Sequence, residues 1–373
     1  MKYVQINAYS GGWANSIIFK KHHELIEAGD ESWVFWARGN HAEDEYMQKI
    51  ASYPEICLDA MLTRIDGKVA LHSRGITKRL LKRLDVIDPD VVHLHVLLGY
   101  YINIEMLFNW LANHRCQVIW TLHDCWAFTG HCIHFEYVQC EQWKSHCGSA
   151  CACPQPNAYP ETYRKGMESY LFDVKKNLFT LLPTNRMKLV VPSEWLAKLV
   201  RQSFLGIYDI TVINNTIDTS VFRPRRSYFK KKYGINDRAM VLSVASKWTE
   251  RKGLNDVFKL SESLDPSDFV VVVVGLSDNQ IKHSPRSVIG LPRTGSIDEL
   301  VDIYNAADVF FNPTQEDNYP TVNLEAEACG TPVVTYDTGG CAETIEMVSS
   351  KVVGSFCEAV SAIKEIVQTT NNS

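Results

Sequence analysis

Two carboxylates stand eight positions apart across a junction between a loop and a helix, Asp317 in the loop and Glu325 in the helix. Pro320 suits the first turn of that helix, and Gly330 suits its left-handed end. A helix N-terminus offers free N–H groups and positive potential to an anion such as a phosphate, and carboxylates beside it could hold sugar hydroxyls. The segment therefore predicts a site for a phosphorylated sugar. A solvated acidic turn before an ordinary amphipathic helix is the alternative.

Two lysines stand five positions apart, Lys247 and Lys252, after a predicted strand over 240–245. Lys252 directly precedes Gly253, where a further helix is expected. Two ammonium groups with this spacing can contact two oxygens of a diphosphate. A solvated lysine-rich loop is the alternative.

Polar residues also end two predicted strands in the first half of the chain. His123 follows a strand over 117–122, and the pair Gly11 and Gly12 follows a strand over 3–8. The carboxyl ends of parallel strands are where open α/β sheets bind ligands, and glycines let a backbone approach a phosphate closely. A structural histidine and a bare turn are the alternatives.

Short apolar strands alternate with amphipathic helices along the chain, which predicts an α/β protein. At 373 residues it exceeds one ordinary domain. Its apolar content of 46% and charge of 22% are typical of a soluble globular protein, and a net charge of −5 gives no argument for nucleic-acid binding. No run approaches the roughly 20 apolar residues of a membrane span. Eleven cysteines without a secretory signal indicate a reducing compartment, so we expect a cytoplasmic protein.

These segments resemble, in order and spacing, the motifs of glycosyltransferase family 4, whose members are retaining enzymes. Residues 325–333, Glu-Ala-Glu-Ala-Cys-Gly-Thr-Pro-Val, resemble the second half of its E-x7-E motif. Asp317 stands where the first glutamate is usual, and Glu316 is the rival for that position. Residues 246–253 resemble the family's phosphate-binding loop, with Lys247 where arginine is commoner. Residues 210–224 resemble its interdomain connector, and residues 336–344 its closing Gly-Gly-x-x-Glu segment.

The resemblance implies the GT-B fold, in which two Rossmann-like domains face each other across a cleft and a C-terminal helix crosses back to the first domain. The acceptor-side domain would span residues 1–205, with a cysteine-rich insertion at 125–158 and the crossover helix at about 357–373. The domain that binds the nucleotide sugar would span residues 206–356.

The resemblance also implies the reaction, which is retaining transfer of a sugar from a nucleoside diphosphate sugar to a glycan. The Asp-Asn-x-Pro sequence at 317–320 is familiar in a polysaccharide-building branch, so the expected acceptor is a lipid-linked oligosaccharide of a bacterial surface polysaccharide. No divalent-metal D-x-D element is found, so no catalytic cofactor is expected. The residues expected to carry catalysis are His123, Lys252, Asp317 and Glu325. Those expected to bind the donor are Gly11, Gly12, Lys247, Lys252, Asn318, Tyr319 and Glu325.

The insertion suggests a metal. Residues 130–154 show little apolar periodicity to fold them unaided, and four cysteine thiolates would make a closed tetrahedral zinc shell. In a reducing compartment a metal is favoured over disulfides. The sequence predicts a structural zinc ion held by Cys132, Cys140, Cys147 and Cys153. Cys151 or His131 is an alternative ligand, and free buried thiols or an oxidised pair are alternatives to the metal.

A predicted helix over 74–85 carries five cations and four apolar residues. Such a helix can lie peripherally on the anionic inner face of a cell membrane, or it can pack its apolar side on the sheet and solvate its charges. Two other functions were weighed for the chain, a Rossmann-type oxidoreductase and a non-enzymatic zinc-bearing adaptor. The missing G-x-G-x-x-G fingerprint counts against the first.

Overall fold

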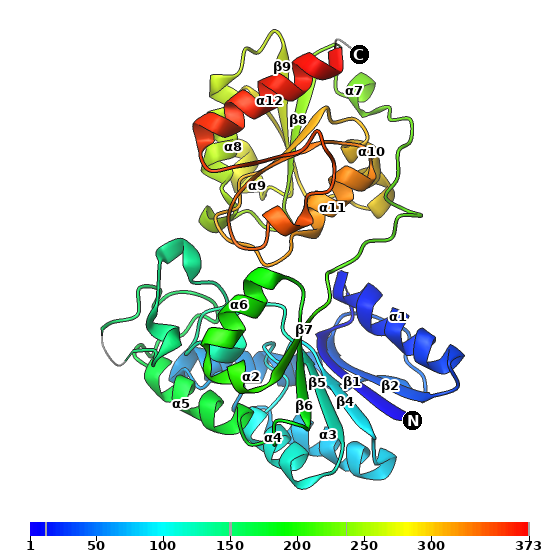
Figure 1. Ribbon diagram of the computed structural model, residues 1–373, viewed down its shortest axis with the longest axis vertical. Helices are drawn as coiled ribbons and strands as arrows, with labels where there is room; N and C mark the ends of the chain where they lie inside the picture. The colour runs from blue at the N-terminus through cyan, green and yellow to red at the C-terminus, as the bar shows by residue number, and fades with distance from the viewer. Residues whose placement is uncertain (12, 149–150, 236, 372–373) are drawn as a thin grey trace. The chain divides into compact units, whose positions relative to one another are not determined.

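The computed structural model describes residues 1–11, 13–148, 151–235 and 237–371, and the chain divides into two compact units, Met1–Ile213 and Asn214–Ser373. In Figure 1 the first unit runs from blue to green and the second from green to red. Each unit is a parallel sheet flanked by helices, which confirms the predicted α/β class.

The first unit contains a seven-stranded sheet in the order β3-β2-β1-β4-β5-β6-β7, and every pairing in it is parallel. The strands are β1 (Lys2–Tyr9), β2 (Glu31–Arg38), β3 (Met47–Lys49), β4 (Val91–Leu94), β5 (Gln117–Thr121), β6 (Met187–Val191) and β7 (Asp209–Val212). Because β1 lies between β2 and β4, the order of the strands reverses there. The carboxyl ends of β1 and β4 therefore form a topological switch point, where open α/β sheets bind ligands.

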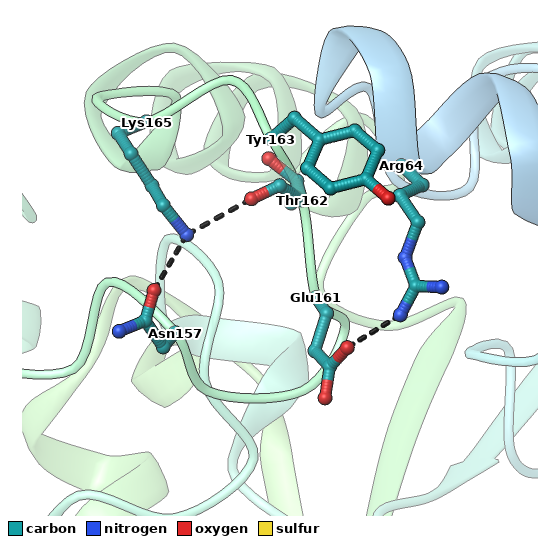
Figure 2. A pocket seen from close by; sticks show the side chains of 6 residues that line it. All are labelled: Arg64, Asn157, Glu161, Thr162, Tyr163 and Lys165. Carbon is teal, nitrogen blue, oxygen red and sulfur yellow. Dashed lines mark hydrogen bonds and ion pairs between the residues drawn. The ribbon is translucent and has the colours of Figure 1, made fainter.

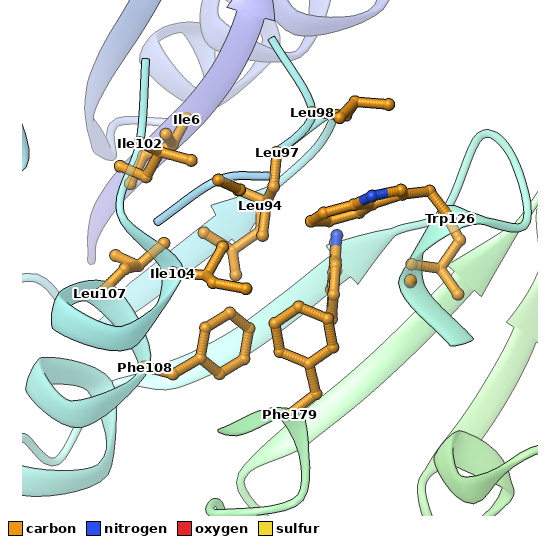
Figure 3. Packing of buried hydrophobic residues seen from close by; sticks show 14 of the residues in the cluster. Ile6, Leu94, Leu97, Leu98, Ile102, Ile104, Leu107, Phe108, Trp126 and Phe179 are labelled. Carbon is orange, nitrogen blue, oxygen red and sulfur yellow. The ribbon is translucent and has the colours of Figure 1, made fainter. Parts of the chain in front are cut away.

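Helices cover this sheet and bury their apolar sides against it. They are α1 (Trp13–Glu27), α2 (Tyr53–Asp66), α3 (Arg74–Ile87), α4 (Ile104–Asn113), α5 (Glu168–Phe179) and α6 (Glu194–Gln202). Figure 3 shows α4 and α5 contributing Leu107, Phe108 and Phe179 to a core shared with Ile6 of β1 and Leu94 of β4. This core fixes the strands whose ends carry polar residues.

Helix α5 begins later than the sequence indicated. We expected a helix from Tyr159, but residues 159–167 form an irregular segment and α5 starts at Glu168. Gly166 has φ +79° in this segment, a left-handed conformation that interrupts helical geometry. The polar composition of the segment did not reveal where the helix would begin.

Helix α3 buries Ile76, Leu80 and Leu84 in the core, so the packed alternative predicted for its apolar side is the one that the structure shows. Its N-terminal cations are partly paired: Arg79 lies 2.6 Å from Glu55, and Arg74 lies 4.0 Å from Glu105. Its apolar side is therefore not available to lipid, and its exposed cations alone could contact an anionic surface.

The second unit contains a six-stranded parallel sheet in the order β10-β9-β8-β11-β12-β13. The strands are β8 (Ala239–Val244), β9 (Phe269–Val274), β10 (Val288–Leu291), β11 (Val309–Asn312), β12 (Val333–Tyr336) and β13 (Lys351–Val353). The helices are α7 (Phe229–Lys232), α8 (Leu254–Ser263), α9 (Asp278–Lys282), α10 (Ile297–Tyr304), α11 (Thr321–Ala328) and α12 (Phe356–Asn371). Here the strand order reverses between β8 and β11, so their carboxyl ends form the second switch point.

The division of the chain differs from the sequence prediction in two places. Strand β7 pairs with β6, so the first unit extends to Ile213, beyond the predicted boundary at residue 205. Helix α12 packs within the second unit, whereas we predicted that it would cross back to the first domain. The reason is that its apolar residues Ala359, Ile363 and Val367 fill the core over β12 and β13.

Within the described residues, no helix is long and apolar enough to cross a membrane.

Candidate active site

The switch point of the second sheet brings together two of the predicted catalytic residues. Lys252, in the loop after β8, forms an ion pair through Nζ with Oδ2 of Asp317, in the loop after β11. Their side chains are 24% and 19% exposed, so water screens the pair only partly while a ligand can still reach both groups. A cation and a carboxylate therefore meet where an α/β sheet binds ligands.

Two glycines hold the loops of this site against one another. Gly253 has φ +75°, and a Cβ there would collide with the carbonyl of Pro313. Gly339, in the loop after β12, has φ +59°, and a Cβ there would collide with the carbonyl of Asp317. The N–H of Gly340 donates to that same carbonyl at 2.9 Å. Because both contacts are backbone against backbone, the positions of Lys252 and Asp317 follow from the packing of three loops.

Arg251 is a site residue that the sequence analysis missed. Its guanidinium donates to the carbonyl oxygen of Glu316, and its own carbonyl accepts from the N–H of Gln315 at 2.7 Å. These bonds tie the loop after β8 to the loop after β11. The only signal for it in the sequence is its place between Lys247 and Lys252.

The structure also separates Asp317 from its rival. Glu316 is fully buried, whereas Asp317 remains accessible beside Lys252. The two residues that follow, Asn318 and Tyr319, are buried in the turn that leads into α11. The backbone N–H of Asn318 donates to Oδ1 of Asp317 at 2.9 Å. Of the two acids, Asp317 is therefore the one that is accessible at this switch point.

Glu325 lies in the second turn of α11, with its carboxylate held by a neighbour from α10. The hydroxyl of Tyr304 donates to Oε2 of Glu325 at 2.9 Å. Burial raises the pKa of Glu325, although the hydrogen bonds from Tyr304 and Thr321 act in the opposite direction. Tyr304 itself is fully buried, so it fixes the orientation of this carboxylate. Nothing in the local sequence pattern singled out Tyr304.

Lys247 is exposed, and within the described residues it has no hydrogen bond or ion pair. Its ammonium group is therefore available to an anion, unlike that of Lys252, which an incoming anion must share with Asp317.

In the first unit, His123 follows β5 and belongs to a group of three histidines. The rings of His123 and His95 stack at 5.8 Å between centroids, and those of His95 and His93 lie 4.1 Å apart. Nε2 of His93 lies 2.8 Å from Oγ1 of Thr121. Burial lowers the pKa of His93 to about 3 and that of His123 to about 4, so both are neutral near pH 7. The His-x-His spacing on β4, which puts two rings on one face, was the overlooked signal.

A small cavity of about 20 Å³ lies at the carboxyl ends of β4 and β5, with His95, His123 and Asp124 in its lining. Gly11 is exposed after β1, and a Cβ there would meet nothing within 4 Å, which leaves its backbone open to a ligand. Gly12 lies outside the described residues.

The predicted zinc ligands lie in the irregular insertion after β5. Cys132 and Cys147 are buried, and Cys140 and Cys153 are half-buried. Burial raises the pKa of Cys147 to about 11, and the neighbouring Cys140 and Cys153 add to the shift. Among the residues that the structure describes, no group of three or more His, Cys, Asp and Glu side chains is arranged to hold a metal ion.

The sequence of the second unit matches a known family. Residues 226–372 match the model of glycosyl transferases group 1. The second unit is therefore similar to the group 1 glycosyltransferases, and the chain is a glycosyltransferase. Its family resemblance over the first unit comes from a full-length relative, the putative colanic acid biosynthesis glycosyl transferase WcaC of Escherichia coli (strain K12). That protein is 26% identical over 372 residues, which cover 95% of this glycosyltransferase and 87% of the relative.

A second relative matches the glycosyltransferase over a shorter stretch. It is the N,N'-diacetylbacillosaminyl-diphospho-undecaprenol alpha-1,3-N-acetylgalactosaminyltransferase of Campylobacter jejuni subsp. jejuni serotype O:2. Its identity is 27% over 124 residues, and the match covers 32% of each chain.

Solved structures confirm the fold. The sucrose-phosphate synthase of Thermosynechococcus elongatus superposes with a TM-score of 0.67 at 15% identity, covering 99% of this chain and 90% of the other. HepE of Anabaena in complex with UDP superposes with a TM-score of 0.63 at 14% identity, covering 99% and 91%. The glycosyltransferase therefore has the predicted GT-B fold, although α12 packs within the second unit.

Proposed function

We propose that this glycosyltransferase transfers a sugar, with retention of anomeric configuration and without a catalytic metal, from a nucleoside diphosphate sugar to a lipid-linked oligosaccharide of a bacterial surface polysaccharide. The observation that carries the proposal is the ion pair of Lys252 with Asp317 at the β8/β11 switch point, in the loop after β8 that also carries the exposed Lys247. The names of the two relatives, one in colanic acid biosynthesis and one acting on a diphospho-undecaprenol sugar, support the acceptor class.

In this proposal the two lysines stabilise the leaving group. As the bond from the anomeric carbon to the diphosphate oxygen breaks, negative charge develops on the diphosphate, and Lys247 and Lys252 would neutralise it. Fixed charges aimed at a developing charge are commonly the largest contribution to catalysis. The free N–H groups at the start of α11 add positive potential at the same place. The lysines and the helix N-terminus would neutralise the charge of the leaving diphosphate, as a divalent metal does in metal-dependent enzymes.

The carboxylates would bind the donor's hydroxyls. With the diphosphate bound to Lys252, Asp317 would accept hydrogen bonds from the donor sugar. Glu325, oriented by Tyr304, would hold the ribose hydroxyls. His123 is neutral near pH 7 and would offer a hydrogen bond in the sugar region without adding a second positive charge.

The donor can be identified with the intact protein and a panel of nucleoside diphosphate sugars. A ligand that binds only the folded state raises its melting temperature, by an amount that grows with concentration over Kd. We expect one nucleoside diphosphate sugar to raise the melting temperature. In the presence of a lipid-linked glycan, its sugar should be transferred to the glycan, and the anomeric configuration in the product should be the same as in the donor. Stabilisation by NAD and none by any nucleotide sugar would instead favour the oxidoreductase.

Peripheral attachment to an anionic membrane through α3 is part of the proposal. Since the apolar side of α3 is buried, we expect attachment to depend on charge alone, at about 1 kcal/mol per cation near the surface. Binding to vesicles containing phosphatidylglycerol should fall as salt rises and when Lys78, Lys82 and Arg83 are replaced with glutamine. The same replacements at Lys230, Lys231 and Lys232 of the second unit form the matched control. Equal binding by both triple variants would remove α3 as the attachment site.

A structural zinc ion at Cys132, Cys140, Cys147 and Cys153 stays a prediction. In its favour, backbone N–H groups point at two of the sulfurs: Gly130 donates to Cys147 Sγ at 3.1 Å and Gln155 to Cys153 Sγ at 3.4 Å. Such bonds stabilise thiolates, the form that binds zinc. Elemental analysis of protein purified without added metal should find one zinc per chain, and a chelator should lower the melting temperature. Sub-stoichiometric zinc and indifference to the chelator would contradict the prediction.

A further inference from the structure

Arg38 lies between two tyrosine rings at the switch point of the first sheet. It ends β2, and its guanidinium carbon is 5.8 Å from the ring centroid of Tyr9, which ends β1. The same carbon is 5.4 Å from the ring of Tyr100, in the loop after β4. A cation at this distance is attracted by the ring faces. Three neighbouring strands therefore place an arginine and two tyrosines at one edge of the sheet.

No carboxylate of the described residues balances the charge of Arg38, and its Nε is buried without a hydrogen-bond partner. Arg64 provides the contrast: its guanidinium lies 5.9 Å from the ring of Tyr163, but it pairs with Glu161. A buried donor left without an acceptor has lost its hydrogen bond to water and carries a desolvation cost. An anionic ligand at Arg38 would remove that cost.

The backbone around Arg38 is built tightly. The N–H of Ser10 donates to the carbonyl of Arg38 at 2.8 Å, which ties the ends of β1 and β2 together. A Cβ at Gly99 would lie 2.9 Å from Cβ of Ala8, so the loop after β4 is pressed against β1. Tyr100, next to Gly99, has φ +62°, a left-handed conformation that is strained for a non-glycine residue. Such strain is concentrated at binding and catalytic sites, and here it directs a tyrosine toward Arg38.

A third tyrosine comes from the insertion after β5. The ring of Tyr159 meets the ring of Tyr100 edge-on at 6.2 Å between centroids. The loop that carries it is fastened to α2, since the N–H of Tyr163 donates to the carbonyl of Arg64 at 2.7 Å. We call Arg38, Tyr9, Tyr100 and Tyr159 the Arg38 cluster.

Figure 2 shows the polar side chains along this loop and on the neighbouring α2. They line an open hollow of about 400 Å³ beside α2, where Arg64 faces Glu161 and Lys165 reaches Asn157 at 2.7 Å. The guanidinium of Arg64 is thus already paired with a carboxylate, and the ammonium group of Lys165 is held by oxygen atoms of its own loop. Neither group belongs to the Arg38 cluster.

We propose that the Arg38 cluster binds the phosphate or diphosphate group of the acceptor. This inference rests on the proposed function and names the acceptor group that the first unit recognises. A guanidinium binds phosphate oxygens through two parallel hydrogen bonds and is always charged, and tyrosine hydroxyls add donors. The cluster lies at the carboxyl edge of the same parallel sheet as His123, so an acceptor anchored there has its phosphate end at the ligand-binding edge.

The test measures binding of three probes to the full-length protein: farnesyl diphosphate, inorganic pyrophosphate and farnesol. All measurements use the Lys252→Ala background, so that a diphosphate bound at the second unit does not contribute. We expect Arg38→Gln to weaken farnesyl diphosphate binding by about 10- to 100-fold, as loss of a hydrogen-bonded charge does. Arg38→Lys should restore part of the affinity. Arg64→Gln is the matched control, since it removes a stacked arginine whose charge is already paired, and it should bind as the parent does.

Each outcome is informative. If pyrophosphate also binds and its binding depends on Arg38, the site recognises the phosphate group alone. If farnesyl diphosphate binds with that dependence while pyrophosphate does not bind, the site recognises a lipid headgroup. Farnesol bound as tightly as its diphosphate, no binding of either diphosphate, or equal binding by Arg38→Gln and Arg64→Gln would overturn the inference. In an otherwise unchanged chain, Arg38→Gln should keep the rise in melting temperature caused by the nucleotide sugar. If no nucleotide sugar raises the melting temperature of the wild-type protein, the proposed function is refuted. Binding of farnesyl diphosphate at Arg38 can still be measured in that case, so the two proposals fail separately.

Discussion

Replacing Lys252 with alanine should lower the turnover number by about 100- to 1,000-fold while the protein stays folded. The substitution removes the ammonium group that would oppose the charge developing on the leaving diphosphate. Because the ion pair of Lys252 with Asp317 is only partly buried, its loss should cost little stability. Steady-state kinetics with the identified donor and a melting curve for each variant measure the two effects separately.

Two comparisons make this result specific. Lys259→Ala removes an exposed lysine of α8 that pairs with Asp256 at 3.5 Å, and it should leave turnover unchanged. Asp317→Asn removes the partner of Lys252 but keeps the lysine itself. If Lys252 served only to hold Asp317, Lys252→Ala and Asp317→Asn would lower the turnover number by the same factor. A turnover number for Lys252→Ala within twofold of the wild type would refute the assignment of this lysine to the diphosphate.

Acid should destabilise the first unit well above the pH at which most carboxylates are protonated. Burial lowers the pKa of His93 to about 3 and that of His123 to about 4, below the usual 6.5. The unfolded chain binds protons at these histidines below pH 6.5, whereas the native state does not. The contribution of these neutral histidines to the free energy of unfolding is therefore fully present above pH 6.5, and it is lost as the pH falls toward 4. The expected loss at pH 4 is on the order of 3 kcal/mol for one such histidine.

Urea unfolding at several pH values between 7.5 and 4 measures this loss. His93→Gln keeps a polar partner for Thr121 and removes a proton-binding site, so the free energy of unfolding should fall less steeply with decreasing pH in this variant. His283→Gln, at an exposed histidine of α9's end, is the control and should follow the wild type. A wild-type stability that is constant between pH 6.5 and 4, or a slope unchanged in His93→Gln, would contradict the prediction.

Local pattern was enough to predict many elements of both units, although not where α5 begins. The uninterrupted apolar run Phe269–Val274 predicts a buried strand and forms β9, and Ser193, a residue type favoured at a helix N-cap, accepts from the N–H of Leu196 at 3.1 Å at the start of α6. Gly330 ends α11 with φ +85°. These features depend on neighbouring residues alone, through burial of one strand, satisfaction of one N–H group and one permitted backbone conformation. The order and spacing of the motifs likewise predicted the GT-B fold and identified Lys252, Asp317 and Glu325 as site candidates.

Only the tertiary structure decided which of these residues meet. Lys252 and Asp317 are 65 residues apart, and their contact depends on the strand order that places β11 beside β8. Tyr304 and Arg38 carry no motif, because their importance comes from a partner on another element: Glu325 for the first and Tyr100 for the second. The prediction for α12 was wrong for the same reason. The periodicity of the helix showed that one side is apolar, but not which sheet that side packs against. A sequence pattern shows which groups must be buried or paired, whereas chain topology and loop packing choose their partners.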